Sequence, residues 1–578
     1  MRSMRAVLLV CRGTLLLALL AAPGALAQVQ LGPGEERPEV EEFPPEEAPP
    51  SAMELPPIPP PTREERLSAG LEVFVREFVV EGSTVFSPEE LERITAPYTG
   101  RTISSEELLA AGDAITDHYV EHGYITSGAL VPDQQVEDAV VRIQVLEGVL
   151  AEVSIEGTRW FRERYFRSRL LRAGRPPVSV DRLEELLQRF QRDPHIERVN
   201  ARLEPGAQLG ESVLNLVVEE GRPYRLLASF SNDRPPAVGS SGGFFALGLA
   251  NLLGHADEFT GSFELTEGIE DLELRYELPV TPYDTRLGLR FRNSDLEVVE
   301  EPFEDFVFTE ARTYGLRLSH PVLRTWNHDL WLSLIGERRR SESCLVIFPP
   351  ECEPWAFQPG TDDPEQVVSV LRFVQDWSWR RPRDAIAVRS TASLGIDVLG
   401  ATVSDDPDVP DGQFFAWLGQ VQWVHRFGER WWGSQLVFRT DVQLASRPLL
   451  SLEKFSVGGL RTVRGYRRNE LVRDNGIVAS LELRIPLYRG RLGREVVQLA
   501  PFADFGRAWD ERDDFPDQTL ASLGIGLRVS PFEWLYGEFY WGGRLTEVSR
   551  SYGESDLQDE GIHFRVTVVP TDLLPRWW

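Results

Sequence analysis

An arginine-rich segment and one distant carboxylate are the residues of this chain that could carry chemistry. The segment Ser456-Val-Gly-Gly-Leu-Arg-Thr-Val-Arg-Gly-Tyr466 places arginines among glycines and residues of a type that is usually buried. Further along the chain, Asp504 is the one acid in the apolar run Pro501-Phe-Ala-Asp-Phe-Gly506. Because a guanidinium group can bind a carboxylate through two parallel hydrogen bonds, the two sites could form an ion pair. A surface loop beside a solvated acid is the alternative, and these residues alone leave both open.

Two strands joined by a long connection would position the arginines. The runs Leu436–Leu444 and Ile477–Ile485 alternate between apolar and polar residues, which is typical of a half-buried strand. The connection between them, residues 445–476, is far longer than an ordinary hairpin loop, and such connections are usually functional or disordered. Since this connection also contains buried-type residues such as Val463 and Tyr466, we expect it to be ordered.

The same period of two continues over residues 222–570, where the pattern predicts sixteen strands. In Leu272-Glu-Leu-Arg-Tyr-Glu-Leu278, for example, apolar residues point one way and charged residues the other. A barrel with lipid outside and water inside requires that alternation, and closing the sheet leaves no backbone group unpaired in lipid. Long connections also alternate with short ones, as in outer-membrane barrels. The predicted fold is therefore an all-β, 16-stranded transmembrane β-barrel, with residues 445–476 as its sixth long outer loop.

The arginine segment and the acid-containing strand resemble two motifs of one protein superfamily. Val463-Arg-Gly-Tyr466 and Phe502-Ala-Asp-Phe-Gly506 are similar to the VRGY/F and FxDxG motifs of the outer-membrane superfamily that secretes or inserts proteins through a 16-stranded barrel. In that family the sixth outer loop folds back into the lumen, and its arginine pairs with the aspartate of the barrel wall. The resemblance implies a lumen-loop motif of Val463, Arg464, Gly465 and Tyr466. It implies a partner motif on the wall of Phe502, Asp504 and Gly506.

Two similar units precede the barrel, at residues 71–148 and 149–221. Each is predicted to have the order β-α-α-β-β, and the first opens with the alternating run Val73–Val80. This order, with the matching ends Val145-Leu-Glu-Gly148 and Val218-Glu-Glu-Gly221, resembles two small α+β POTRA domains. A small sheet with an exposed edge can receive an extended peptide as an added strand. Two spacer domains without a binding role are the alternative.

The two ends of the chain have distinct compositions. Residues 1–27 combine arginines, an apolar run and the small-x-small site Ala25-Leu-Ala27, which predicts a secretory signal peptide. Residues 28–70 are rich in proline and glutamate, so we expect a linker without a fixed structure and no plug helix before residue 62. Residues 571–578 follow the last predicted strand as a short tail that ends in two tryptophans.

Three cysteines occur in the chain. Cys11 would leave with the signal peptide, so Cys344 and Cys352 remain as a pair in an exported protein. In an oxidising compartment such a pair usually forms a disulfide, which we expect in the fourth outer loop. Two free thiols are the alternative.

Several classes of site are not expected. His118 and His122 lie four residues apart on a predicted helix and could share a face, but no third ligand is apparent, so no metal site is predicted. The sequence contains neither a P-loop nor an H-E-x-x-H motif, so we expect no cofactor and no enzymatic activity. A formal net charge of −29 argues against a nucleic-acid partner.

Two POTRA-like units followed by a 16-stranded barrel resemble the transporters of two-partner secretion, of the FhaC/ShlB/HecB type. That resemblance implies a location in the outer membrane of a Gram-negative bacterium, with the POTRA domains in the periplasm. It implies a secreted partner protein with an N-terminal secretion domain, which is captured unfolded and crosses the barrel. Outer-membrane lipid, lipopolysaccharide and the barrel assembly machinery would be the other partners. The alternatives are an outer-membrane assembly or insertion factor, whose known examples usually carry three or more POTRA units, and a passive porin, which needs no periplasmic domains.

Overall fold

The computed structural model describes residues 53–54 and 72–573, apart from 326, 349–350, 358–362, 407, 491–492, 512–516 and 549–554. The chain divides into two compact units. One comprises Ala48–Pro223 with Leu253–Ala256, and the other contains Tyr224–Leu252 and the chain from Asp257 onward. The expected signal peptide, most of the expected linker and the end of the tail lie outside the described residues.

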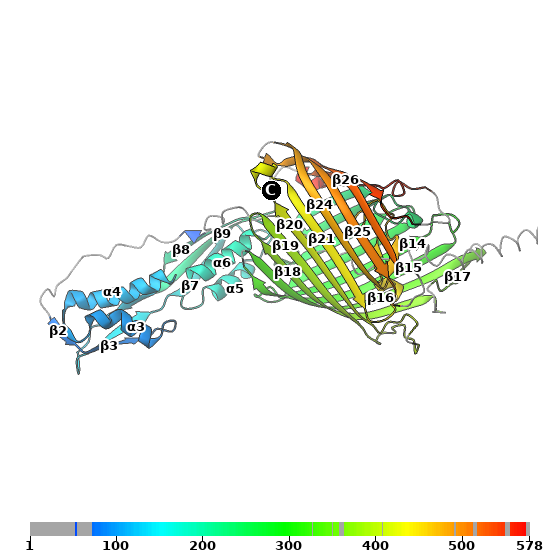
Figure 1. The fold of residues 1–578 in the computed structure, drawn as a ribbon. Helices are drawn as coiled ribbons and strands as arrows, with labels where there is room; N and C mark the ends of the chain where they lie inside the picture. The colour runs from blue at the N-terminus through cyan, green and yellow to red at the C-terminus, as the bar shows by residue number, and fades with distance from the viewer. Residues whose placement is uncertain are drawn as a thin grey trace, which may run out of the picture. The chain divides into compact units, whose positions relative to one another are not determined.

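The first repeat contains two short sheets and two α-helices (Figure 1). One sheet has the strand order β3-β6-β5 and the other pairs β2 with β4. The helices begin where their sequences supply caps: the Ser87 hydroxyl accepts a hydrogen bond from the Glu90 N–H, and Ser104 with Glu107 forms a capping box. The elements are β2 (Glu72–Val75), β3 (Glu77–Glu81), α3 (Pro88–Thr95), the 3-10 turn Ala96–Tyr98, β4 (Arg101–Ser104), α4 (Ser105–Glu121), β5 (Gly128–Leu130) and β6 (Val140–Leu146).

The opening strand of this repeat differs from the sequence-based expectation. The run Val73–Val80 was expected to form one strand, but it divides at Arg76 into β2 and β3, which belong to different sheets. Val75 and Phe78 are both buried although they are three residues apart. In one straight strand they would point to opposite faces. The break at Arg76 allows both side chains to enter the core.

The second repeat has the expected order β-α-α-β-β around one four-stranded sheet, whereas the first repeat has the additional strand β4 between its helices. Leu183, Leu187 and Phe190 of α6 are buried with Leu214 and Leu216 of the sheet, so the apolar face of the helix and one face of the sheet form the core. The elements are β7 (Val149–Glu156), α5 (Glu163–Ala173), α6 (Val180–Gln191), β8 (Ile196–Pro205) and β9 (Glu211–Glu220).

The expected linker contributes a strand to this sheet. Met53 and Glu54 form β1, which pairs in parallel with β8 and completes the order β1-β8-β9-β7. The expectation that residues 28–70 have no fixed structure is therefore wrong at these two residues. The reason is the Met53 side chain, which is buried in the core of the second repeat and offsets the cost of ordering the segment.

The second unit is a closed antiparallel barrel, and the expectation of sixteen long strands is confirmed (Figure 1). The last strand pairs with the first, so the sheet has no free edge. The long strands are β10 (Tyr224–Ser231), β11 (Gly242–Ala250), β12 (Glu258–Leu265), β13 (Ile269–Pro279), β14 (Arg286–Glu297), β15 (Val307–Arg324), β16 (His328–Phe348), β18 (Glu365–Arg380), β19 (Asp384–Gly395), β20 (Phe415–Arg426), β21 (Gln435–Ala445), β24 (Asn475–Arg489), β25 (Glu495–Trp509), β26 (Gln518–Phe532), β27 (Leu535–Arg544) and β28 (Ile562–Val568).

A short additional strand, β17 (Glu351–Pro354), pairs with the end of β16. β16 extends into the residues that were expected to form the fourth outer loop, because the pairing with β15 continues as far as Leu345. Cys344 therefore lies within a strand and not in an irregular loop. Short 3-10 turns occur at Pro236–Val238, Glu429–Trp431 and Pro570–Leu573.

The two faces of the barrel differ in chemistry, as the alternation predicted. Large apolar side chains such as Leu289, Leu316 and Ile525 are exposed on the outer face. Charged side chains on the inner face pair across neighbouring strands, as Arg290 of β14 does with Glu273 of β13. None of the helices in the described part of the chain has the length and apolarity needed to cross a bilayer.

A charged loop inside the barrel as the candidate functional site

Residues 446–474, here called the lumen loop, connect β21 to β24 and fold back against the inner face of the barrel. The loop contains a 3-10 turn at Ser451–Glu453 and a small hairpin of β22 (Phe455–Val457) and β23 (Leu471–Arg473). Five apolar side chains around this hairpin form one buried cluster with the wall residues Leu418, Val478, Ala508 and Leu520.

The direction of the wall side chains shows that the loop lies inside the barrel. Leu481, Phe505 and Leu523 are exposed, and they lie on the same strands as the wall residues of the cluster but at positions of opposite parity. Successive side chains of a strand point to opposite faces. The wall residues that contact the loop therefore face the lumen.

Within the lumen loop, Arg464 lies between two carboxylates of the wall. Its Nε and Nη2 donate to the carboxylate of Asp504 on β25 at 2.8 and 2.9 Å, and its backbone N–H donates to Asp504 Oδ2 at 3.0 Å. Its Nη1 donates to Glu482 on β24, and its Nη2 donates to Ser480 Oγ at 3.1 Å. Arg464, Asp504 and Glu482 are between 3% and 5% exposed. Glu482 also accepts from Arg484 of its own strand at 2.7 Å, so two guanidinium groups balance two carboxylates in this cluster.

Two aromatic rings complete the surroundings of Arg464. The guanidinium carbon lies 3.6 Å from the ring centroid of Phe502 and 4.7 Å from that of Tyr540. A cation over a ring face is attracted by the negative charge of the π-system, and the attraction is stronger in a desolvated site. Phe502 therefore points into the lumen and is covered there by the arginine.

The glycines of both motifs lie where the loop backbone approaches the wall. Gly465 has a φ of +96°, and a Cβ at this residue would lie 2.8 Å from the carbonyl oxygen of Gly542. A Cβ at Gly506 would lie 2.4 Å from Val457 and 2.8 Å from Val463, both in the lumen loop. Any larger residue at these positions would push the loop away from the wall.

Tyr466 is fully buried, and its hydroxyl lies 2.8 Å from the carbonyl oxygens of Ala521 and Thr546. The structure thus brings together all seven residues of the two sequence motifs. Sequence reasoning missed Glu482, although a signal was present. In Leu481-Glu-Leu-Arg-Ile485 the leucines occupy the outer face, which assigns Glu482 to the lumen.

A second contact joins the loop to another part of the wall. Glu453 is 1% exposed and accepts hydrogen bonds from Arg339 of β16 at 2.9 Å and from Arg372 of β18 at 2.7 Å. Arg372 also donates to Glu337 at 3.0 Å. The lumen loop is therefore attached to β16 and β18 as well as to β24 and β25.

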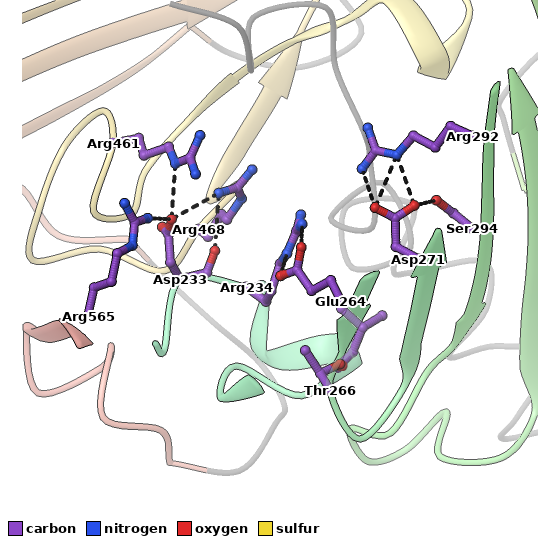
Figure 2. A network of polar contacts seen from close by, with 11 residues as sticks. Asp233, Arg234, Glu264, Thr266, Asp271, Arg292, Ser294, Arg461, Arg468 and Arg565 are labelled. Atoms are coloured by element: carbon purple, nitrogen blue, oxygen red, sulfur yellow. Dashed lines mark hydrogen bonds and ion pairs between the residues drawn. The ribbon is translucent and has the colours of Figure 1, made fainter. Parts of the chain in front are cut away.

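A third contact joins the loop to the strands that close the barrel (Figure 2). Asp233 lies two residues after the end of β10, the first strand. Its Oδ2 accepts from Arg461 at 3.1 Å and from Arg565 of the last strand at 2.7 Å. Arg468 lies 3.4 Å from the same oxygen and donates to the Asp233 carbonyl at 3.1 Å. Burial alone would raise the pKa of Asp233, but the charges of Arg468, Arg461 and Arg565 outweigh it and hold that pKa below its usual range.

Among the sixteen long strands, the strands joined by Asp233 share the shortest pairing. β10 pairs with β28 only over Ala228–Ser231, whereas it pairs with β11 along its whole length. Asn232 extends the junction, because its side chain donates to the Ile562 carbonyl and accepts from the Phe564 N–H, both at 2.8 Å. The lumen loop thus adds two arginines to a closure that has few backbone hydrogen bonds of its own.

Figure 2 also shows one ion pair from the connection after β10 and one between neighbouring strands. Arg234 pairs with Glu264 of β12, and Asp271 of β13 pairs with Arg292 of β14 at 2.9 Å. The loop arginines each have an acidic partner, since Arg467 also pairs with Asp559 and Glu300; these arginines are Arg461, Arg464, Arg467 and Arg468. These arginines therefore bind the loop to the strands of the wall and to the connections between them.

Cys344 of β16 and Cys352 of β17 form a disulfide, with 5.5 Å between their Cα atoms. The bond joins the two strands of a terminal hairpin, in which Val346 pairs with Cys352. It lies outside the lumen-loop contacts.

We expect mass spectrometry of non-reduced peptides to show Cys344 linked to Cys352. Closing so short a segment stabilises the chain by roughly 2–3 kcal/mol at most, so the variant with both cysteines replaced by serine should secrete at nearly the wild-type level. Two free thiols in the mature protein would contradict the prediction.

The two histidines of α4 have protein partners. His118 Nε2 lies 3.1 Å from Glu90, and His122 Nδ1 lies 2.8 Å from the carbonyl oxygen of His118. Within the described residues, no group of three or more His, Cys, Asp or Glu side chains is arranged to hold a metal ion.

One serine fits a hydrolase pattern without the structure that such a pattern needs. Gly239-Ser-Ser-Gly-Gly243 matches G-x-S-x-G, in which the serine of a nucleophile elbow follows a strand and precedes a helix. Here the run lies between a 3-10 turn and the strand β11. It therefore does not form a nucleophile elbow.

Comparisons with known proteins agree with this architecture. Residues 73–148 match the ShlB-type POTRA domain family, and residues 370–529 match the haemolysin secretion/activation protein family ShlB/FhaC/HecB. The outer membrane transporter CdiB of Dickeya dadantii is 22% identical over 481 residues, which are 80% of this chain and 81% of that protein. The heme/hemopexin transporter protein HuxB of Haemophilus influenzae is 20% identical over 76% of this chain and 78% of its own length.

Among solved structures, CdiB from Escherichia coli superimposes with a TM-score of 0.64 at 21% identity. The match covers 89% of this chain and 93% of that chain, so the two share one fold. The two matched regions, the similarity to these relatives over most of the chain and the closed sixteen-stranded barrel lead to one conclusion: this chain has the architecture of the two-partner secretion transporters of the outer membrane, and two of its regions match the ShlB-type POTRA domain and ShlB/FhaC/HecB families.

Proposed function

We propose that this transporter secretes one unfolded exoprotein through its barrel and that the lumen loop is the movable part of the path. The observation that supports this most directly is the position of residues 446–474, which pack against the wall of the lumen. A polypeptide that passes along this wall must displace the loop. A passive porin has no need of such a loop, which argues against that alternative.

The two sequence motifs have distinct roles in this proposal. Val463, Arg464, Gly465 and Tyr466 form the part of the loop that binds the wall, and Phe502, Asp504 and Gly506 form its seat. Arg464 makes the main attachment, because it contacts both Asp504 and Glu482. Val463 and Gly506 provide the close packing that keeps water away from this cluster.

Ion pairs suit a loop that must be held firmly and still be released. An apolar plug would have to expose its whole contact surface to water when it moved. Charged partners in a lumen that water can enter exchange their hydrogen bonds for bonds to water, at a cost well below that of stranding a charge in a dry site. We infer that entry of the exoprotein opens these contacts in sequence.

An insertion factor for other barrels is the second candidate. The chain has two POTRA-like repeats before its barrel, where such factors usually have three or more, and the relatives described above are named as transporters. Without a P-loop in the sequence, we propose that passage is driven by folding of the exoprotein outside the cell and not by nucleotide hydrolysis, and we assign no catalytic role to the chain.

The remaining partners follow from the surface of the barrel. We propose that its exposed apolar side chains contact outer-membrane lipid, that its outer rim contacts lipopolysaccharide, and that the barrel assembly machinery inserts it.

Comparison of the culture medium with and without the transporter tests this function. We expect deletion of its gene to remove one large exoprotein from the medium and complementation to restore it. Quantitative proteomics of the medium is the measurement. An unchanged set of secreted proteins would contradict secretion, whereas a general loss of outer-membrane barrels would favour the insertion factor.

A further inference from the structure

A cavity of about 90 Å³ lies on the inner face of the barrel wall, where strands β14 to β20 line it. Leu452 of the lumen loop forms part of its lining. Since one water molecule needs about 15 Å³ of such space, the cavity has room for roughly six waters and is large enough for a polyatomic anion. Seven of the lining residues are arginines, and one, Glu337, is an acid. The cavity is therefore strongly cationic, although the chain as a whole has a net charge of −29.

Five of these arginines share their acidic partners. The pairs are Arg290 with Glu273 and Glu337, Arg317 and Arg389 with Asp376, Arg339 with Glu453, and Arg372 with Glu337 and Glu453. Five cations thus share four carboxylates. The other two arginines of the lining, Arg292 and Arg340, have acidic partners of their own. Among all these acids only Glu337 lines the cavity, so the cations face the space and would attract an anion there.

A buried glutamine in the same lining has both a donor and an acceptor to offer. Gln420 of β20 is 1% exposed, and in the described part of the chain neither atom of its amide has a hydrogen-bond partner. Its neighbours across the sheet are Arg389 and Asp441, of which only Arg389 lines the cavity. The Arg317 Nε is buried and has no hydrogen-bond partner among the described residues. Buried polar groups usually have partners, so these atoms indicate a ligand that both accepts and donates.

We propose that this cavity is a binding site for a small oxyanion that still carries a proton, of which hydrogen phosphate is the simplest. Its ionised oxygens would accept from the arginines and from the amide NH₂ of Gln420. Its O–H would donate to Gln420 Oε1. Sulfate has a similar size but carries no proton at neutral pH, so it cannot make the second bond. The proposal does not rest on secretion, because it concerns binding to the resting barrel.

Calorimetric titration of the purified full-length transporter with inorganic phosphate tests the proposal. We expect saturable binding of one phosphate per chain at neutral pH, and sulfate should bind about tenfold more weakly because it cannot donate to Gln420. Gln420→Leu removes both amide groups, so it should weaken phosphate binding about tenfold or more and abolish the preference over sulfate. Loss of the preference is the decisive readout, since a change in packing alone would affect both anions equally.

Matched variants separate the site from its surroundings. Gln422 lies on the same strand and face and is buried, but it does not line the cavity, so Gln422→Leu should bind phosphate normally. Arg317→Gln should weaken binding about tenfold, because it removes a charged donor. Arg312→Gln on the same strand should have no effect, since the ion pair of Arg312 with Glu310 is exposed.

An isosteric variant keeps the test decisive if Gln420→Leu does not fold. Gln420→Glu retains the size of the side chain and places a carboxylate beside Arg389, so the barrel should still give its compact band on gels, while phosphate binding falls at least tenfold. Three results would overturn the proposal: no saturable binding at millimolar phosphate, which would leave water alone in the cavity, equal affinity of the wild type for phosphate and sulfate, or unchanged binding by folded Gln420→Glu.

Discussion

Replacing Arg464 with alanine is expected to lower secretion roughly tenfold or more, while the barrel still inserts into the outer membrane. The change removes the cation that pairs with the buried Asp504, whereas Glu482 on the neighbouring strand keeps its pair with Arg484. Removing one partner of a buried pair costs roughly 3–5 kcal/mol, and water in the lumen reduces that cost. The barrel strands keep their backbone hydrogen bonds, so the change weakens the attachment of the loop and not the barrel. Secreted exoprotein, normalised to folded barrel in outer-membrane fractions, is the measurement.

Matched variants separate this effect from a general loss of arginine. Arg507 lies on β25 as well, but its ion pair with Asp517 is solvent-exposed, so Arg507→Ala should secrete normally. Asp504→Asn should resemble Arg464→Ala, because Asp504 accepts three of the hydrogen bonds from Arg464. Glu482→Gln should be milder for the loop, since Arg464 keeps its pair with Asp504 and the cation that loses its partner, Arg484, belongs to the wall.

Reversing both charges provides the decisive comparison. Arg464→Asp with Asp504→Arg keeps opposite charges at the two positions, so it should recover part of the secretion that each single reversal loses. Wild-type secretion by Arg464→Ala would exclude the proposed anchor, and equal defects in the double and single variants would exclude direct pairing.

Replacing Asp233 with alanine is expected to weaken the closure of the barrel. Arg461, Arg468 and Arg565 would then face one another without the carboxylate that they share. Like charges in a partly buried site repel, and the β10–β28 pairing offers few backbone hydrogen bonds to compensate. We expect a lower temperature for loss of the compact band on gels, and larger, more frequent conductance openings in planar bilayers.

A surface acid supplies the control for Asp233. Glu310 pairs with Arg312 on β15, and both side chains are exposed, so Glu310→Ala should change neither the gel transition nor the conductance. Asp233→Asn would show whether the charge or the size of this side chain matters for closure, because it keeps the size and removes the charge. If Asp233→Ala matched the wild type in both measurements, the three arginines would not contribute to barrel closure.

The sequence by itself determined the class of fold. Period-two alternation between residues 222 and 570 predicted sixteen strands, because each strand must present apolar atoms to lipid and polar atoms to the lumen at every second residue. That requirement is local and can be recognised in one strand at a time. The candidate pair of Arg464 and Asp504 was also accessible, since each stood out against its neighbours and both resembled known motifs.

Contacts that depend on register were decided only by the tertiary structure. Ser480 pairs with Asp504 and Glu482 with Phe502 across β24 and β25, and this register brings the second acid to Arg464. Asp233 and Arg565 meet because the barrel closes on itself, which joins the two ends of a long stretch of sequence. No local sequence pattern predicts a contact between residues so far apart in the chain.

The same limit explains the two errors in the periplasmic repeats. The run Val73–Val80 divides at Arg76 because its two halves pair in different sheets. The alternation of residues within one strand does not show which strands it will pair with. Met53 lies in a proline-rich segment that cannot form a core of its own, and it becomes ordered only because the second repeat offers a strand edge and a buried site. Composition determined that the segment could not fold alone, and the tertiary structure decided where two of its residues bind.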